Sequence, residues 1–252
     1  MRTGNLYCCL LIGILFLLIG SSCEKDGNKS PESIIQEKIS GKWLVTGDNI
    51  YKWVEFDKCG NYFIRIISKS GHRYYKWGTC ILKDDTTIDL LNFGTLTISS
   101  IDENSFNFIV KELDETPTAI SALKSKEYDA SKITNLLCTQ WRVSTINGER
   151  FEDVNGRIIY EDDGVTHTQY FFQFFIFTNA GSLYLIHAGD YDLVNDLESY
   201  GWMWKDNEKT IGLTDYDYSH DLELDNLGLS KDKLVLNYFG TELVLVVDCD
   251  GK

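Results

Sequence analysis

The stretch SIIQEKISGKW, residues 33–43, occurs a second time in the chain as SKITNLLCTQW, residues 131–141. Both copies have Ser at the first position, apolar residues at the third and seventh, and Trp at the eleventh. In the first copy Ser33 is placed to cap a helix, and Ile35 and Ile39 lie on one helical face. Strand-like sequence follows each copy. We therefore expect two short helices, each leading into the first strand of a β domain.

The sequence after the first copy is typical of short strands separated by regular turns. Asp57-Lys58-Cys59-Gly60 has the composition of a turn, and aromatic and β-branched residues precede it. Short strands with such regular turns predict an antiparallel barrel or sandwich. The predicted strands are Tyr51–Phe56, Asn61–Ile67, Arg73–Leu82, Thr87–Leu91, Gly94–Ser99, Ser105–Lys111 and Thr118–Leu123.

The second half keeps the landmarks of the first half in the same order. Residues 177–181 (FTNAG) match residues 56–60 (FDKCG), an aromatic strand end that runs into a Gly turn. We also match Trp204 with Trp77, Ile211 with Ile88, and residues 234–236 with residues 106–108. An ordered series of matches over both halves indicates an internal duplication.

The residues Gly41-Lys42-Trp43 after a short helix resemble the GxW opening of the lipocalin superfamily. In that family the helix and the Trp plug the closed end of a barrel. The resemblance covers Ser33–Lys124 and Ser131–Asp248, with Thr139 in place of the Gly in the second copy. It implies an all-β fold, with two antiparallel lipocalin-like β-barrels in tandem, each preceded by a short N-terminal helix.

The first residues have the pattern of a signal peptide. Residues 10–19 form an apolar run of the length of a signal-peptide core. Gly20-Ser21-Ser22-Cys23 then resembles the lipobox of bacterial lipoproteins, although that family usually has an aliphatic residue where Gly20 stands. The resemblance implies a lipid anchor on Cys23 in the outer membrane of a Gram-negative-type bacterium, on its periplasmic or its surface face. The alternative is an uncleaved membrane anchor.

These patterns divide the chain into four parts. Residues 1–22 are the predicted lipoprotein signal peptide and residues 23–32 a polar tether. Residues 33–127 form the first predicted barrel and residues 128–252 the second.

Charge and motif content exclude several function classes. The net charge of −14 disfavours nucleic acid as a partner, because an acidic surface repels phosphate. The sequence has no nucleophile elbow, phosphate-binding loop or zincin helix, and its four His residues have no metal or triad spacing. Residues 215–221 alternate oxygen ligands as calcium loops do, but lack the EF-hand Gly and terminal Glu. We expect no enzyme activity, no cofactor and no metal.

Four cysteines remain after the signal peptide and the lipid-bearing Cys23 are set aside. They are Cys59, Cys80, Cys138 and Cys249, an even number in a compartment expected to be oxidising. Barrel topology brings Cys80 beside Gly60 and pairs the first strand of a barrel with its last. We therefore expect disulfides Cys59–Cys80 and Cys138–Cys249; the alternative is four free thiols.

The two halves differ most after the first strand. Trp43 and Phe56 are 13 residues apart, whereas Trp141 and Phe177 are 36 residues apart. In lipocalin-like barrels this loop lies over the open end, where ligands enter. The extra segment, residues 148–168, and a second, smaller excess before Trp204 suggest a binding site or an extension without a ligand. The candidate ligand-binding residues are Tyr160, His167, Tyr191, Tyr200 and Trp202.

Residues 170–177 (YFFQFFIF) are apolar on both faces of a strand, unlike an ordinary barrel strand. One face should fill the barrel, and the neighbouring barrel or the extra segment should cover the other. A protein partner is the alternative cover.

These observations predict a membrane-anchored lipoprotein that binds a small apolar or aromatic ligand, without catalysis, in the open end of the second barrel. Two alternatives stay open. One is a structural or interaction lipoprotein with solid barrels and a protein partner. The other is a surface lipoprotein that binds glycans by stacking on Tyr191, Tyr200 or Trp202.

Overall fold

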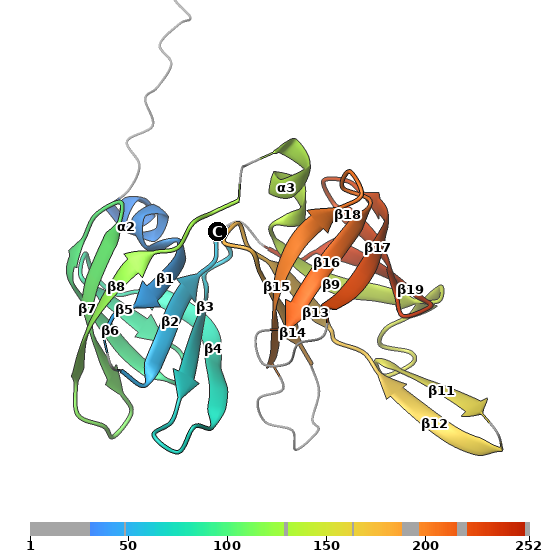
Figure 1. The fold of residues 1–252 in the computed structure, drawn as a ribbon, viewed down its shortest axis with the longest axis horizontal. Helices are drawn as coiled ribbons and strands as arrows, with labels where there is room; N and C mark the ends of the chain where they lie inside the picture. Colours follow the sequence, from blue (N-terminus) through green and yellow to red (C-terminus); the bar gives the residue numbers. More distant parts are fainter. Residues whose placement is uncertain are drawn as a thin grey trace, which may run out of the picture.

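The computed structural model describes residues 31–47, 49–128, 131–162, 164–187, 197–215 and 221–249. The predicted signal peptide, Cys23 and most of the tether lie outside these residues. The described chain forms two closed antiparallel barrels of eight strands, each with a short helix at one end (Figure 1). This is the predicted fold class. Within the described residues, no helix has the length and apolar character needed to span a membrane.

Barrel 1 is preceded by helix α2 (Pro31–Ile39), and its strands follow one another in sequence order. The last strand pairs with the first and closes the barrel, with Trp43 opposite Lys124. The strand bounds lie within two residues of those predicted. They are β1 (Gly41–Val45), β2 (Tyr51–Phe56), β3 (Asn61–Ile67), β4 (Arg73–Leu82), β5 (Thr87–Leu90), β6 (Gly94–Ile101), β7 (Ser105–Glu112) and β8 (Thr118–Lys124).

Barrel 2 is preceded by helix α3 (Lys132–Leu137) and closes when β19 pairs with β9. Its strands are β9 (Gln140–Ile146), β13 (Phe174–Phe177), β14 (Ser182–Ile186), β15 (Leu197–Lys205), β16 (Thr210–Asp215), β17 (Asp221–Leu229), β18 (Lys233–Tyr238) and β19 (Thr241–Val247). The inserted segment adds β10 (Glu149–Arg150), which pairs with β9, and a separate hairpin of β11 (Arg157–Asp162) and β12 (Val165–Tyr170).

The repeated stretch closes one end of each barrel, as predicted. Trp43 and Trp141 are fully buried, and each indole Nε1 donates a hydrogen bond to a carbonyl four residues earlier in the chain. The distances are 2.7 Å to the Ile39 oxygen and 2.8 Å to the Leu137 oxygen. A buried Trp needs such a partner for its N–H, and the last turn of a helix has unpaired carbonyls to supply it. In each barrel the indole N–H and a carbonyl at the end of the helix thus provide each other with a hydrogen-bond partner.

The helix starts are only partly as predicted. In α3, the Ser131 hydroxyl caps the helix and accepts a hydrogen bond from the Thr134 N–H at 3.0 Å. In α2 the helix begins at Pro31, so Ser33 lies inside it and the prediction of a Ser33 cap is wrong. Pro at the first position of a helix is favourable, because its fixed φ suits the helix and its missing N–H would be unpaired there.

Backbone hydrogen bonds settle which residues of the two barrels are equivalent. The Cys80 N–H donates to the Gly60 oxygen at 2.8 Å, and the Trp202 N–H donates to the Gly181 oxygen at 2.9 Å. Trp202 is therefore the counterpart of Cys80, and the match of Trp204 with Trp77 is wrong by five positions. The turn that follows was matched correctly, because Ile88 pairs with Leu82 and Ile211 pairs with Trp204 in the same register.

The barrels meet through the outer faces of equivalent strands, with β2–β4 of barrel 1 against β13–β15 of barrel 2. Phe63 and Tyr184 occupy equivalent positions and stack on each other, with ring centroids 3.7 Å apart and planes 3° apart. Four further buried residues complete this apolar cluster: Trp53, Ile176, Ile186 and Leu197. The Tyr184 hydroxyl donates to Glu55 Oε2 at 2.6 Å.

Two polar contacts across the interface are copies of one another. The Lys42 ammonium donates to Ser182 Oγ at 3.1 Å, and Asn61 Nδ2 donates to Gln140 Oε1 at 2.9 Å. Lys42 is equivalent to Gln140, and Asn61 is equivalent to Ser182. Reciprocal contacts of this kind define a two-fold, isologous interface. The two barrels therefore associate as the subunits of a symmetric dimer do, within one chain.

This interface explains the aromatic run at residues 170–177. The run is not one strand, because β12 ends at Tyr170 and β13 begins at Phe174. In β13 the buried Phe175 and Phe177 fill barrel 2, while Ile176 and Phe174 join the apolar cluster between the barrels. The predicted cover by the neighbouring barrel is confirmed.

Candidate functional site

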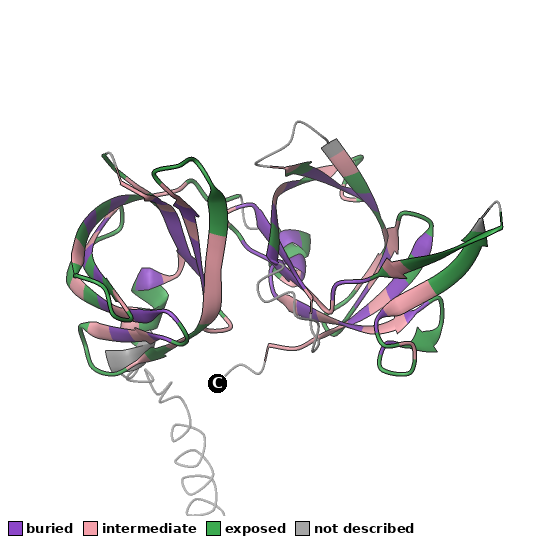
Figure 2. Ribbon diagram, turned by 90° about the horizontal axis from the view of Figure 1, so that it is seen from below, coloured by how far each residue is buried: buried purple, intermediate pink, exposed green. Residues whose placement is uncertain are grey.

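The closed ends of both barrels lie on the same side of the molecule, so both open ends face the opposite side (Figure 1). The inserted segment leaves barrel 2 on the open side, where the loop after the first strand was predicted to lie. Its β11–β12 hairpin projects outward beside the barrel, as the view from below also shows (Figure 2). Phe151, before the hairpin, is instead buried in the core of barrel 2, and Val154 and Ile158 pack against that core.

Two of the predicted ligand-binding residues are on this projecting hairpin. Tyr160 and His167 are cross-strand neighbours on β11 and β12, and their rings stack with centroids 5.3 Å apart. Tyr160 is 47% exposed. Both side chains are thus accessible, but they lie away from the barrel opening.

Tyr200 lies at the open end of barrel 2 and packs against the barrel core. Its hydroxyl donates to Glu198 Oε2 at 2.6 Å. Burial, and then the neighbouring Glu198, raise the pKa of Tyr200, so the phenol keeps its proton. The pair presents a carboxylate that already accepts one hydrogen bond and has further lone pairs for another donor.

Unlike Tyr200, Trp202 is not accessible to a ligand. Trp202 is 2% exposed, and its Nε1 donates to the Thr178 oxygen at 3.1 Å within the closed half of barrel 2. The idea that Trp202 is an exposed platform for a sugar ring is therefore wrong. Tyr191 lies outside the described residues.

Three further residues join Tyr200 and Glu198 at this opening, and sequence reasoning missed all of them. Phe172 contacts the His187 ring at a centroid distance of 4.1 Å and the Tyr238 ring at 6.5 Å. Burial, and then Glu198, raise the pKa of Tyr238 to about 12. We call Phe172, His187, Glu198, Tyr200 and Tyr238 the mouth cluster.

The space below the mouth cluster is filled by side chains. Twenty buried residues form one continuous core in barrel 2, and Trp141, Phe175 and Leu185 within it are at most 1% exposed. Interiors of this kind pack to crystal-like density. A ligand at this end would therefore rest on the mouth cluster and would not enter a deep cavity.

A second recess lies between the barrels near their closed ends. It has a volume of about 80 Å³, and Glu55, Asp57, Cys59, Thr139 and Thr178 contribute to its lining. Glu55 is fully buried, and its Oε1 has no hydrogen-bond partner among the described residues. Its cross-strand neighbour on β1 is the buried Lys42, which carries the opposite charge. A polar recess of this size has room for ordered water.

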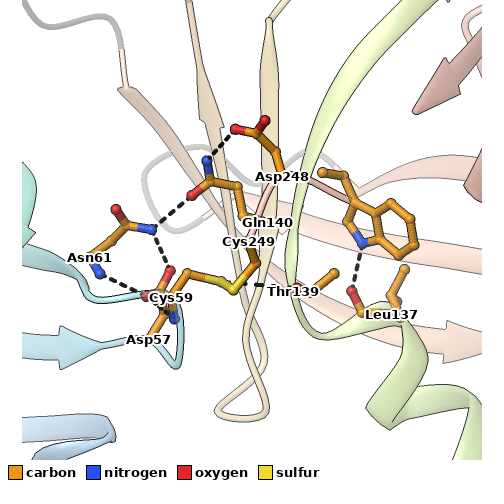
Figure 3. Close-up of a disulfide and its surroundings, with 9 residues drawn as sticks. Asp57, Cys59, Asn61, Leu137, Thr139, Gln140, Asp248 and Cys249 are labelled. Carbon is orange, nitrogen blue, oxygen red and sulfur yellow. Dashed lines mark hydrogen bonds between the residues drawn. A yellow bond between two sulfur atoms is a disulfide. The ribbon is translucent and has the colours of Figure 1, made fainter. Parts of the chain in front are cut away.

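The disulfide at this recess is not the one predicted (Figure 3). Cys59 pairs with Cys249, which links the turn between β2 and β3 of barrel 1 to the end of barrel 2. Both predicted bridges, Cys59–Cys80 and Cys138–Cys249, are wrong, and Cys80 and Cys138 are free. Intrabarrel geometry had suggested the predicted pairs. The isologous interface instead brings the two closed ends together, and this makes a bridge between barrels possible.

The free thiols are poorly suited to chemistry. Burial raises the pKa of Cys80 to about 11 and that of Cys138 to about 12. At neutral pH both remain thiols, whereas nucleophilic attack and metal binding need the thiolate. Among the described residues, no group of three His, Cys, Asp or Glu side chains could hold a metal ion.

A polar chain runs beside the disulfide and crosses the interface (Figure 3). Asn61 Nδ2 donates both to Asp57 Oδ2 at 2.7 Å and to Gln140 Oε1, and Gln140 Nε2 donates to Asp248 Oδ2 at 3.1 Å. Asp57 is 9% exposed. Burial raises its pKa to about 6, although hydrogen bonds from Asn61 and Cys59 act in the opposite direction.

Neither the protein-family models nor the curated proteins include a match to this chain. Among solved structures, the chain is similar to a lipocalin-like protein from Bacteroides uniformis ATCC 8492, with 17% sequence identity and a TM-score of 0.30. That match covers 44% of this chain and 97% of the other. The fold assignment itself rests on the strand order and closure of the two barrels, which are those of up-and-down lipocalin-like barrels.

Proposed function

We propose that this protein is a lipid-anchored envelope protein that binds a small ring-containing ligand, without catalysis, at the mouth cluster of barrel 2. Eight-stranded antiparallel barrels are an architecture that can hold one small ligand. The fold alone does not assign the function, so the mouth cluster must support it.

The single observation that carries the proposal is the combination of rings and a carboxylate at the open end. His187 and Tyr238 offer half-buried aromatic surface against the buried Phe172, and Glu198 offers a hydrogen-bond acceptor held by Tyr200. Ligand sites typically combine apolar walls with a few placed polar groups. This set suits a ligand with an apolar or aromatic ring face and one hydroxyl or amine donor.

The position of the mouth cluster supports the proposed anchor. Helix α2 begins at Pro31 on the closed side of barrel 1, eight residues after Cys23. An extended tether of that length spans roughly 25–30 Å. With Cys23 in the membrane, the closed ends would face the lipid and the mouth cluster would face away from it. A soluble ligand could then reach the site.

Native mass spectrometry of the protein purified from its own host tests the proposal. We expect a bound small molecule on the wild-type chain. We expect its loss from Tyr238→Ala, which removes aromatic surface, and from Glu198→Gln, which removes the charged acceptor.

Tyr160→Ala is the matched control, because it removes an exposed aromatic ring on the hairpin and leaves the mouth cluster intact. It should keep the bound molecule. Wild-type protein without any adduct, or mouth variants that keep the adduct at the wild-type level, would overturn the proposal.

A further inference from the structure

The hairpin of β11 and β12 extends away from both barrels (Figures 1 and 2). Its strands pair over six consecutive residue pairs, from Arg157 opposite Tyr170 to Asp162 opposite Val165, without a bulge. These strands form a sheet of their own that has only two members among the described residues. A sheet of two strands is marginally stable by itself in water.

Apolar side chains are exposed on both faces of this hairpin. Ile159 is 59% exposed on one face, and Tyr160 and Val165 are 47% and 55% exposed on the other. Neighbouring residues of a strand point to opposite faces, so no single contact with barrel 2 could cover them all. The exposure marks an interaction surface.

The outer edges of the hairpin lack most of the features that normally prevent strand addition. Proteins protect exposed edges with charged side chains, above all Lys, or with Pro, bulges or very short strands. On these two strands the charged residues, Arg157, Glu161 and Asp162, lie only near the two ends of the hairpin. Residues 157–170 contain no Lys and no Pro, and the register has no bulge. Counting from the pair that closes the two-residue turn, Ile159 and Thr168 form a pair whose backbone N–H groups point outward. Each edge is therefore ready to accept another strand.

Charge decides between the possible added strands. Residues 148–163 carry six acidic residues and two basic ones, Arg150 and Arg157, and the whole chain has a net charge of −14. A second copy of this chain would bring like charge to the edge, which costs free energy. A strand with Lys or Arg side chains would meet opposite charge.

We propose that the β11–β12 hairpin binds an extended, basic segment of a partner protein by β-strand addition. Backbone hydrogen bonds to one outer edge supply affinity, and the exposed apolar residues with the acidic tip select the segment. The surface is separate from the mouth cluster, so the protein would have two independent binding regions.

A fluorescent peptide of alternating lysine and valine is the probe, titrated against the full chain and followed by anisotropy. The matched peptide of alternating glutamate and valine has the same β-propensity pattern and the opposite charge. We expect the lysine peptide to bind at least about tenfold more tightly, a difference of about 1.4 kcal/mol.

Ile159→Pro and Thr168→Pro each remove an outward N–H from one edge. Pro is tolerated at an edge position whose N–H faces solvent, so the hairpin should persist. We expect one variant to lose at least about tenfold in affinity and the other to bind as wild type, which identifies the edge. In wild-type protein, backbone hydrogen exchange should slow on addition of the peptide along the edge whose proline variant loses affinity. Tyr238→Ala should not change peptide binding, so this test is independent of the ligand at the mouth cluster.

Three results would overturn the proposal: no binding of the lysine peptide, equal binding of both peptides, or wild-type affinity in both proline variants. Concentration-dependent dimerisation in sedimentation velocity that either proline variant abolishes would also overturn it, because it would assign the edge to a second copy.

Discussion

At the open end of barrel 1, Tyr51 is 4% exposed and its hydroxyl donates to Glu112. At the open end of barrel 2, Tyr200 is only half-buried and donates to Glu198, which is exposed. Barrel 1 therefore buries its tyrosine and leaves Glu112 half-buried, whereas barrel 2 has a half-buried tyrosine and an exposed glutamate.

The closed ends show no such divergence. Each has a short helix, a fully buried Trp and one indole hydrogen bond to a helix carbonyl. The duplication has thus kept the end that completes the core and changed the end that faces solvent. The shared plug and the proposed binding site thus lie at opposite ends of the same barrel, as is common where loops on a rigid scaffold carry function.

The largest expected effect is the loss of stability when the buried Trp at the closed end of either barrel is removed. Trp43→Ala and Trp141→Ala each remove a fully buried indole and should each lower the free energy of unfolding by about 3–5 kcal/mol. Urea unfolding followed by circular dichroism measures both.

Trp43→Phe and Trp141→Phe are the controls, because they keep most of the apolar volume and should cost less than the Ala variants. If one Ala variant cost less than about 1 kcal/mol, that plug would be dispensable and the two closed ends would not be energetically equivalent.

The second effect concerns the disulfide between the barrels. Cys59 and Cys249 are 190 residues apart, so their disulfide restricts the unfolded chain strongly. Replacing both by Ser should lower the free energy of unfolding by about 2–4 kcal/mol, the usual range for disulfides.

Wild-type protein under reducing conditions should fall to the stability of this double variant. Cys80→Ser is the control, since Cys80 is a free thiol and its replacement leaves the disulfide intact. A double variant as stable as oxidised wild type would show that the noncovalent interface alone fixes the barrels.

The smallest expected effect is a pH dependence of the unfolding free energy that comes from the turn at Asp57 and not from the equivalent turn at Thr178. Asp57 Oδ1 accepts a hydrogen bond from the Asn61 N–H at 2.8 Å, and in barrel 2 Thr178 Oγ1 accepts one from the Ser182 N–H at 3.1 Å. The pKa of Asp57 is raised from 3.8 to about 6. The folded state thus keeps a proton that the unfolded state has released. Its stabilising contribution is fully present below pH 3.8 and disappears as pH rises through about 6.

That contribution amounts to no more than about 3 kcal/mol, since one pKa unit corresponds to about 1.4 kcal/mol. Asp57→Thr gives barrel 1 the turn residue of barrel 2 and should remove this part of the pH dependence between about pH 4 and 6. Thr178→Ser, which adds no carboxyl, should leave it unchanged. Unfolding free energies measured across this range check both, and a wild-type slope in Asp57→Thr would exclude Asp57 as the source.

The strands and plugs could be predicted because their signals are local. Turn residues such as Gly60, and the spacing of Ile35, Ile39 and Trp43, describe single elements and their immediate neighbours. The strand bounds of barrel 1 follow from these signals to within two residues.

The disulfide could not be predicted, because it depends on how two complete barrels dock. Strand pairing within one barrel says nothing about which outer faces meet. The stacked Phe63 and Tyr184 were visible in the sequence only as two aromatic residues at matching positions.

The mouth cluster was missed for a related reason. Phe172, His187 and Tyr238 are far apart in the sequence and common in type, so only the barrel register brings them together. The error over Trp202 was avoidable. Tyr200, Trp202 and Trp204 alternate along β15 and therefore share its inward face, where the closed half of the barrel must bury the second of them.

The Cys59–Cys249 bridge also makes the chain between these residues a covalent ring. A protease that cuts this ring once, in the hairpin or in the connection between the barrels, opens it without separating the fragments. A cut before Pro31 has the opposite result, because both barrels lie on its C-terminal side and no disulfide among the described residues crosses it. If Cys23 carries the proposed lipid anchor, the tether before Pro31 is therefore the place where a single cleavage would release both barrels intact.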